Sequence, residues 1–115
     1  GFVWKKGGKR RNWKKRFMLL SGGFLYYFVK PPTARPGSRE FINLAKGRIP
    51  LVDAYANGSF EHRKFDFAFQ IITPTRTYIM RADSAAEKDF WLTTVREEAA
   101  LLRYQHDLAA AGSST

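Results

Sequence analysis

The distribution of hydrophobic and polar residues over the first thirty positions predicts three consecutive β-strands. Residues 1–6 and 13–20 are rich in aromatic and aliphatic side chains, and the turn-forming pair Gly7-Gly8 lies between them. Ser21-Gly22-Gly23 marks a second turn, which leads into the aromatic run Phe24 to Val29. Three strands joined by two short connections are typical of an antiparallel meander.

The next segment, residues 30–46, predicts a long exposed loop. Regular structure is interrupted there by three prolines and a glycine, which are Pro31, Pro32, Pro36 and Gly37. The apolar residues of the loop that are available to pack back onto the sheet are Phe41, Ile42 and Leu44.

Four further strands and a helix are predicted after this loop. Two short strands are expected at 47–51 and 54–57, and the segments 65–72 and 77–82 flank Thr73-Pro74-Thr75-Arg76 as in a hairpin. Seven strands are therefore expected in all.

A C-terminal helix is predicted to begin near Ser84. Ser84 and Glu87 have the spacing of a capping box, in which each side chain accepts a hydrogen bond from the backbone near the other. Apolar residues then recur at helical spacing, and they are Trp91, Val95, Ala99 and Leu102. We expect this stripe to pack on the sheet, because acidic residues accompany the bases on the polar face, unlike in a membrane-surface helix.

This order of elements predicts a single, mainly β domain with a helix at its end. A chain of 115 residues has room for one core, and we assign residues 1–108 to the domain and residues 109–115 to a flexible tail of small residues. The chain contains no cysteine, which fits a reducing cytosolic compartment. No segment approaches the roughly 20 apolar residues that span a bilayer, so membrane contact is expected to be peripheral.

Charge is concentrated at the start of the chain, and this distribution points to a function. The formal net charge is +10, and the first sixteen residues hold eight cations and no anion. Such a cluster creates a local positive potential suited to phosphate-rich partners. A solvated basic strand pair that only confers solubility is the alternative.

The alternation of side chains along a strand places some of these cations on one face. Val3 and Lys5 share one side of the first strand, and Lys14 and Arg16 share one side of the second strand with Met18 and Leu20. In a barrel this arrangement predicts a packed interior that opens into a basic mouth, where Lys5, Lys14 and Arg16 converge on a phosphorylated group. Tyr27 in the third strand repeats the pattern and is expected to donate a hydrogen bond from its hydroxyl to a phosphate oxygen, or else to serve as a sheet aromatic.

The remaining cations of the cluster are assigned to other contacts. Lys9 lies in the connection between the first two strands, from which it can fold over the ligand. Cations near an anionic membrane surface contribute about 1 kcal/mol each. We expect four residues to make such contacts, namely Lys6, Arg10, Arg11 and Lys15.

Nearly the whole chain resembles a pleckstrin homology domain. The resemblance is carried by Gly1-Phe2-Val3-Trp4-Lys5, Asn12-Trp13-Lys14-Lys15-Arg16-Phe17-Met18-Leu19-Leu20, Leu25-Tyr26-Tyr27-Phe28, Lys46-Gly47-Arg48-Ile49-Pro50-Leu51, Phe67-Ala68-Phe69-Gln70-Ile71, and Glu87 with Trp91. It implies a seven-stranded antiparallel barrel or sandwich of two nearly orthogonal sheets, capped by a C-terminal helix in which Trp91 packs into the core. The resemblance is strongest to phosphoinositide-binding members such as the cytohesins.

The resemblance also implies a set of headgroup ligands. Lys5, Lys14 and Arg16 correspond to the principal phosphate ligands, with Lys9 as a loop contact and Tyr27 as a hydrogen-bond donor. Lys46 corresponds to a further basic contact before the fourth strand. Because the loop before that strand is long, Arg35 or Arg39 are alternatives for this role.

The predicted function is recruitment to the cytosolic leaflet, most simply of the plasma membrane, through a phosphoinositide lipid. Lipids phosphorylated at the 3-position, PI(3,4,5)P3 or PI(3,4)P2, are expected to be preferred, with PI(4,5)P2 as an alternative. The domain is expected to be monomeric, with no cofactor and no metal.

The sequence bears on three other classes of function. A protein-interaction module of the same fold is an alternative or additional role. A basic protein with exposed aromatic residues is also compatible with single-stranded nucleic acid, although the cations gather at one hairpin end and do not form a stripe. Enzymatic activity is not expected, because His62 and His106 are isolated and neither Ser59 nor Ser84 has a recognisable base partner.

Overall fold

The structure is a computed structural model, and it describes residues 1–8 and 12–113. In chain order its elements are β1 (Phe2–Lys6), β2 (Trp13–Ser21), β3 (Phe24–Phe28), α1 (Arg39–Leu44), β4 (Gly47–Pro50), β5 (Tyr55–Asn57), β6 (Ala68–Ile72), β7 (Thr77–Arg81) and α2 (Ala85–Ser113). The predicted class is confirmed: seven antiparallel strands are followed by a long C-terminal helix.

The seven strands form one hydrogen-bonded ladder in the order β4-β3-β2-β1-β7-β6-β5. The two expected sheets are therefore continuous through β1, which pairs along its whole length with β2 but with β7 only at Trp4↔Arg81 and Lys5↔Met80. Gly22 and Gly23 both have positive φ, 57° and 83°, which is what a tight turn between β2 and β3 requires.

The main core lies between the inner face of the strands and α2. Val3, Met18, Leu25 and Phe69 are almost completely buried there. Trp91 is 5% exposed within the same cluster, so its expected role in core packing is confirmed. Burial of such side chains supplies most of the free energy that holds the two halves of the sheet together.

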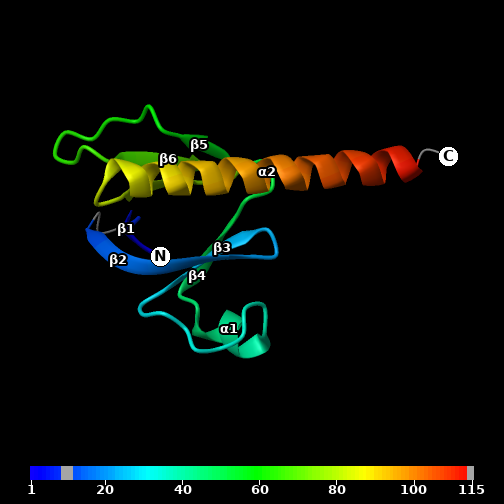
Figure 1. Ribbon diagram of the computed structural model, residues 1–115, viewed down its shortest axis with the longest axis horizontal. Helices are drawn as coiled ribbons and strands as arrows, with labels where there is room; N and C mark the ends of the chain where they lie inside the picture. Colours follow the sequence, from blue (N-terminus) through cyan, green and yellow to red (C-terminus); the bar gives the residue numbers. More distant parts are fainter. Residues whose placement is uncertain (9–11, 114–115) are drawn as a thin grey trace.

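Helix α2 begins as predicted and ends later than predicted. Ser84 Oγ accepts a hydrogen bond from the Glu87 backbone N–H at 3.1 Å, and Glu87 accepts one from the backbone N–H of Asp83 at 3.2 Å. Residues 109–113, which were expected to belong to a flexible tail, continue the helix to Ser113. The physical reason is the high helix propensity of the alanines in this stretch, and Figure 1 shows the helix projecting beyond the sheet.

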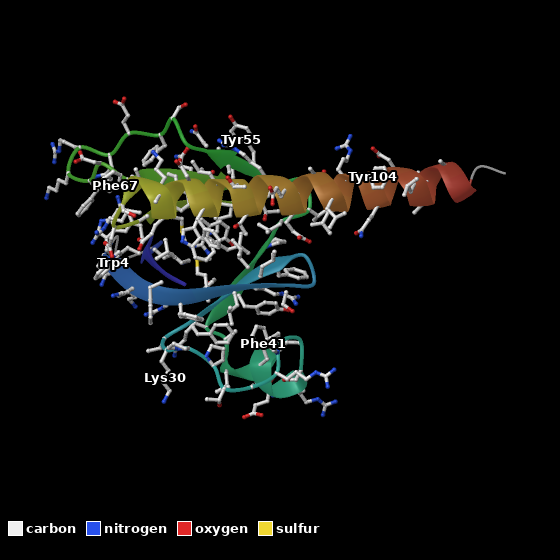
Figure 2. The ribbon with its side chains drawn as sticks, in the orientation of Figure 1. Trp4, Lys30, Phe41, Tyr55, Phe67 and Tyr104 are labelled. Atoms are coloured by element: carbon white, nitrogen blue, oxygen red, sulfur yellow. The ribbon has the colours of Figure 1, made fainter. Side chains whose placement is uncertain are left out.

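The segment between β3 and β4 is also more ordered than predicted. It contains the short helix α1, whose first turn is capped by Ser38 Oγ, which accepts a hydrogen bond from the Phe41 backbone N–H at 3.1 Å. Phe41 is fully buried, and the centre of its ring lies 5.0 Å from that of Tyr26 and 4.9 Å from that of Phe28. These rings form a second core, and Figure 2 shows Phe41 on α1, on the side of the sheet away from α2. Only part of residues 30–46 is therefore an exposed loop.

The hairpin predicted at 65–72 and 77–82 is present with a later start. Its first strand, β6, begins at Ala68, and Phe65 packs on the outer face of the sheet. There the Phe65 ring lies 5.5 Å from Trp13 and 4.0 Å from the Arg81 guanidinium. Thr73 closes the turn by accepting from the Arg76 backbone N–H and donating to its carbonyl.

Candidate functional site

The strand register brings the predicted cations to one face of the meander. Lys5 pairs directly with Lys14, and Val3 pairs with Arg16, so these residues share the inner face of β1 and β2. Along the other edge of β2, Met18 pairs with Tyr27 of β3 on the same inner face. Because the side chains on this face pass from buried Met18 to Arg16 and exposed Lys14, the core opens into a basic mouth beside the connection from β1 to β2.

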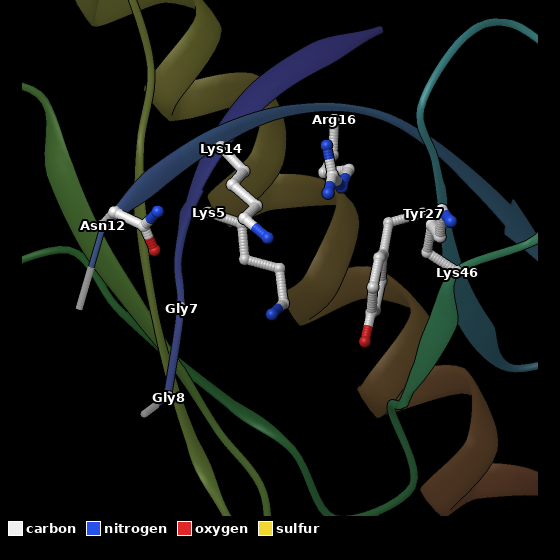
Figure 3. Close-up of a pocket in the computed structure, with 8 residues that line it drawn as sticks. All are labelled: Lys5, Gly7, Gly8, Asn12, Lys14, Arg16, Tyr27 and Lys46. Carbon is white, nitrogen blue, oxygen red and sulfur yellow. The ribbon is translucent and has the colours of Figure 1, made fainter. Parts of the chain in front are cut away.

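A pocket of about 250 Å³ occupies this mouth. Figure 3 shows Lys5, Lys14, Arg16 and Tyr27 around the same space, with their polar ends toward it. None of the described residues that line the pocket is acidic. The full lining is Lys5, Gly7, Gly8, Asn12, Lys14, Arg16, Tyr27 and Lys46.

Lys5 carries its charge in a partly buried environment beside other cations. Partial burial lowers its pKa, and the nearby charges of Arg76, Arg16 and Lys14 lower it further. Its ammonium group lies 4.9 Å from the centre of the Tyr27 ring and 5.7 Å from that of Tyr78, so aromatic faces replace part of its lost hydration. An anion in the pocket would relieve the repulsion among these cations.

Tyr27 forms the wall of the pocket opposite β1. Burial raises the pKa of its hydroxyl, and the neighbouring Tyr78 raises it further, so the phenol stays protonated at neutral pH and can donate a hydrogen bond. The backbone of Gly47 passes so close that a Cβ atom there would overlap the Tyr27 hydroxyl. A glycine at this position is therefore needed for the Tyr27 ring to stand in its place.

The third wall is made by Lys46, the residue before β4. Its backbone N–H donates to the Tyr27 carbonyl at 2.8 Å, which anchors the end of the long connection to β3. Lys46 lines the pocket, whereas Arg35 and Arg39, the alternatives considered for the same role, do not. Both of these arginines belong to the part of the connection that folds back with α1.

The cations assigned to the membrane surface separate from those of the pocket. Lys6 pairs with Trp13 and Lys15 with Trp4, which places both lysines on the outer face of the β1–β2 hairpin. The Lys15 ammonium lies 5.0 Å from the centre of the Phe2 ring. Three other predicted residues lie outside the described part of the chain, and they are Lys9, Arg10 and Arg11.

Two side chains that contribute to the site, those of Asn12 and Arg76, were not predicted. Asn12 lines the pocket, and its carbonyl accepts from the Gly7 backbone N–H at 2.9 Å, closing the base of the hairpin. Arg76 comes from the turn between β6 and β7, stacks 4.5 Å from the Tyr78 ring centre and acts on the pKa of Lys5. The signal for Arg76 was its even spacing from Tyr78 and Met80, which are the inward-facing residues of β7.

Solved structures with the same fold share this architecture. A solution structure of a pleckstrin homology domain is 22% identical in sequence and superposes with a TM-score of 0.71, covering 90% of this chain and 85% of that one. The C-terminal PH domain of pleckstrin, crystallised in complex with D-myo-Ins(1,2,3,5,6)P5, is 24% identical, with a TM-score of 0.68 over 86% of this chain and 91% of that one. At these identities the likeness establishes the fold.

The match to a family model, together with a sequence relative, establishes the family. A RAC family serine/threonine-protein kinase homolog of Dictyostelium discoideum is 30% identical over 102 residues, which are 89% of this chain but only 21% of that protein. The chain thus spans about a fifth of the length of this relative. The family model described as the PH domain matches residues 1–100. With that match, and with seven antiparallel strands capped by a C-terminal helix, the chain belongs to the PH domain family.

Proposed function

We propose that this domain binds the phosphorylated headgroup of an inositol lipid in the pocket at the mouth of its barrel. The observation that carries the proposal is the convergence of Lys5, Lys14 and Arg16 from two paired strands on one space of about 250 Å³. Phosphate oxygens accept charge-assisted hydrogen bonds from several such cations at once, which offsets the desolvation of each. Supporting this proposal, the C-terminal PH domain of pleckstrin has been crystallised with inositol pentakisphosphates.

In this proposal the pocket residues divide into phosphate ligands, a hydrogen-bond donor and a further cation. Lys5, Lys14 and Arg16 hold the phosphates, Tyr27 donates a hydrogen bond from its hydroxyl, and Lys46 adds a cation from the third wall. Lys9 was assigned a loop contact and stays a prediction outside the described residues. Lipids phosphorylated at the 3-position are proposed as the preferred ligands, which rests on the likeness of Lys5, Lys14 and Arg16 to the basic motif of the cytohesins. The relatives found, pleckstrin among them, do not single out the cytohesins.

Binding of this kind recruits the domain peripherally to a cytosolic membrane leaflet. None of the helices that the structure describes combines the length and the apolar character needed to cross a membrane. Lys6 and Lys15, together with Arg10 and Arg11 in the connection, are proposed to meet the anionic leaflet, where a cation contributes about 1 kcal/mol.

The deciding experiment is calorimetric titration of the domain with soluble inositol phosphates. We expect Lys5→Ala and Arg16→Ala to weaken binding about 10- to 100-fold each, since hydrogen bonds to charged groups contribute about 1.5–3 kcal/mol. Lys64→Ala, an exposed lysine in the connection before β6, is the matched control and should bind as the wild type does. Unchanged binding in both pocket variants, with folding verified by heat denaturation, would place the ligand elsewhere.

The same titration separates the rival functions. A single-strand nucleic-acid groove would give a steep salt dependence and little preference among isomeric inositol phosphates. A pocket with fixed donors should distinguish those isomers. A protein-interaction module that has lost lipid affinity would bind none of them at micromolar concentration.

A further inference from the structure

The side of α2 that faces away from the strands carries exposed apolar residues. Four large side chains are involved, and each is between 47% and 61% exposed. We call them the outer stripe, which consists of Phe90, Leu101, Tyr104 and Leu108. Two buried residues of the same helix, Trp91 and Val95, pack in the main core instead. Figure 2 shows Tyr104 on the part of α2 that projects beyond the sheet.

The spacing of the outer stripe is that of a helix that pairs with another helix. Leu101, Tyr104 and Leu108 are separated by three and then by four positions, and Phe90 precedes Tyr104 by two heptads. Apolar residues that repeat every 3.5 positions on one helix face are the pattern through which two helices pack side by side. A surface helix of a globular domain normally has one apolar stripe, which faces the core. The outer stripe is therefore a second apolar face of α2.

A cavity of about 250 Å³ lies where the outer stripe begins, between the start of β1 and the first turns of α2. Phe2 and Phe90, which are 41% and 58% exposed, supply two of its apolar walls. Trp91 and Glu87 line it as well. A hollow of this kind accepts one bulky apolar side chain of a partner, as buried anchors do in protein interfaces.

The charged side chains beside the outer stripe are acidic. Glu97 is exposed and precedes Leu101 by four positions, which places the two side chains next to each other on the helix surface. Glu87 is exposed and precedes Phe90 by three positions, so it lies beside the other end of the stripe. A partner on this face therefore meets carboxylates among apolar residues.

The arginines of α2 are directed away from this face. Arg96 donates a hydrogen bond to the Ala56 carbonyl at 3.1 Å, and Arg103 donates one to a carboxylate oxygen of Asp53 at 3.4 Å. Both acceptors belong to β5 or to the turn before it. The outer face of α2 is thus acidic on a domain whose formal net charge is +10. It is complementary to a basic partner, whereas the same face of a second copy would repel it.

We infer that the outer face of α2 binds a helix of a partner protein, one that combines an apolar stripe with basic residues. The partner helix lies along the outer stripe, places a bulky apolar side chain in the cavity beside Phe90, and pairs its cations with Glu87 and Glu97. None of the described residues that line the headgroup pocket comes from α2, so this inference does not rest on the proposed function.

The test measures the fluorescence anisotropy of two labelled synthetic helical peptides as the domain is added. Both peptides have leucine at the a and d positions of about three heptads, flanked by lysine in the basic peptide and by glutamate in the acidic peptide. We expect the basic peptide to bind at least about tenfold more tightly, although the net charge of the domain favours the acidic one. Leu101→Ser and Leu108→Ser should each weaken binding of the basic peptide about 5- to 20-fold, because a leucine side chain no longer leaves water on binding.

Charge reversal supplies a variant that leaves the outer stripe intact. Glu97→Lys should weaken binding of the basic peptide and strengthen binding of the acidic peptide, each about three- to tenfold. The matched controls are Ile42→Ser and Glu40→Lys in α1, where Ile42 is 45% exposed and Glu40 is exposed. Both controls should bind each peptide within about twofold of the wild type. Circular dichroism and thermal unfolding verify that every variant is folded.

Three results would overturn the inference. The first is equal binding of the two peptides by the wild type, and the second is binding of the basic peptide by the Leu101 and Leu108 variants as tight as that of the Ile42 control. The third is self-association of the domain in sedimentation equilibrium that Leu101→Ser abolishes, because a second copy would then occupy the face. A domain that binds the basic peptide as expected but binds no soluble inositol phosphate would refute the proposed function and leave this inference standing.

Discussion

Lys5 and Lys14 are direct partners in the antiparallel ladder between β1 and β2, with their side chains on the same face. Like charges directly opposite each other destabilise a strand pair. Arg16 and Arg76 add to the repulsion, and all three neighbours lower the pKa of Lys5 after burial has done so. The folded domain therefore tolerates an unfavourable cluster at this point, which a polyphosphate ligand would neutralise.

Replacing Lys5 by Met is expected to stabilise the domain while weakening headgroup binding at least tenfold. The substitution removes a desolvated charge but keeps an unbranched side chain against Tyr27 and Tyr78. We expect the midpoint of thermal unfolding to rise by several degrees at neutral pH, as a change of about 1 kcal/mol produces in a domain of this size. Calorimetry with and without soluble headgroup measures both effects.

The pH dependence of this difference follows from the lowered pKa of Lys5. Below that lowered pKa the lysine is charged in both the folded and the unfolded state, so the gain in the Met variant is constant. Between the lowered pKa and the ordinary value of 10.5 the unfolded state binds more protons, and the wild type becomes relatively more stable as pH rises. The advantage of the variant should shrink over this alkaline window. An advantage that grows there would contradict the assignment.

Neighbouring residues on β2 should separate the two kinds of lipid contact. Lys14→Ala removes a cation from the pocket and should weaken binding of a soluble inositol phosphate about tenfold or more. Lys15→Ala, on the opposite face, should leave that binding unchanged and weaken attachment to anionic vesicles about fivefold, as expected for one surface cation. Equal effects of both variants on the soluble ligand would contradict the face assignment.

Arg76 is expected to support the pocket from a third element of the fold. Arg76→Ala should weaken headgroup binding about three- to tenfold, because a cation beside the pocket is lost, and should raise the pKa of Lys5. The pKa is measurable by NMR titration of the Lys5 side chain. Arg76→Lys keeps the charge and should restore most of the affinity. If neither property changes in the alanine variant, Arg76 serves only to stack on Tyr78.

Trp91 and Phe90 form a matched pair for the core. Trp91→Ala should lower the free energy of unfolding by about 3–5 kcal/mol, since it truncates an aromatic side chain buried between α2 and the strands. Phe90 is 58% exposed, and its truncation should change stability little. Urea denaturation followed by circular dichroism measures both. Similar losses for the two variants would argue against the observed orientation of α2.

The second core offers a test of its own. Phe41→Ala should destabilise the domain by about 3 kcal/mol or release α1 from the sheet, because the ring fills the space between Tyr26 and Phe28. Ile42→Ala is the control, since Ile42 is 45% exposed one residue further along the same helix. Hydrogen exchange of the amides in residues 39–44 distinguishes local release from global loss. Unaltered protection in the Phe41 variant would contradict the packing described.

The strands, the capped helix and the inner-face cations followed from the sequence by itself, because each depends on local periodicity. Alternation along β1 and β2 placed Lys5, Lys14 and Arg16 on one face before any tertiary contact was known, and the spacing of Ser84 and Glu87 marked the start of α2. The resemblance to the PH family added Lys46, which has no such periodic signal.

Only the tertiary structure decided which distant segments meet. The approach of Arg76 to Lys5 depends on the pairing of β1 with β7, and the burial of Phe41 depends on how the long connection folds back over Tyr26 and Phe28. Neither contact can be read from local periodicity. For Phe41, the prolines of residues 30–46 interrupt regular structure without indicating where the chain packs back onto the sheet. The length of α2 was missed for a related reason: small residues are compatible with a tail and with a helix, and the continuing helix decides between them.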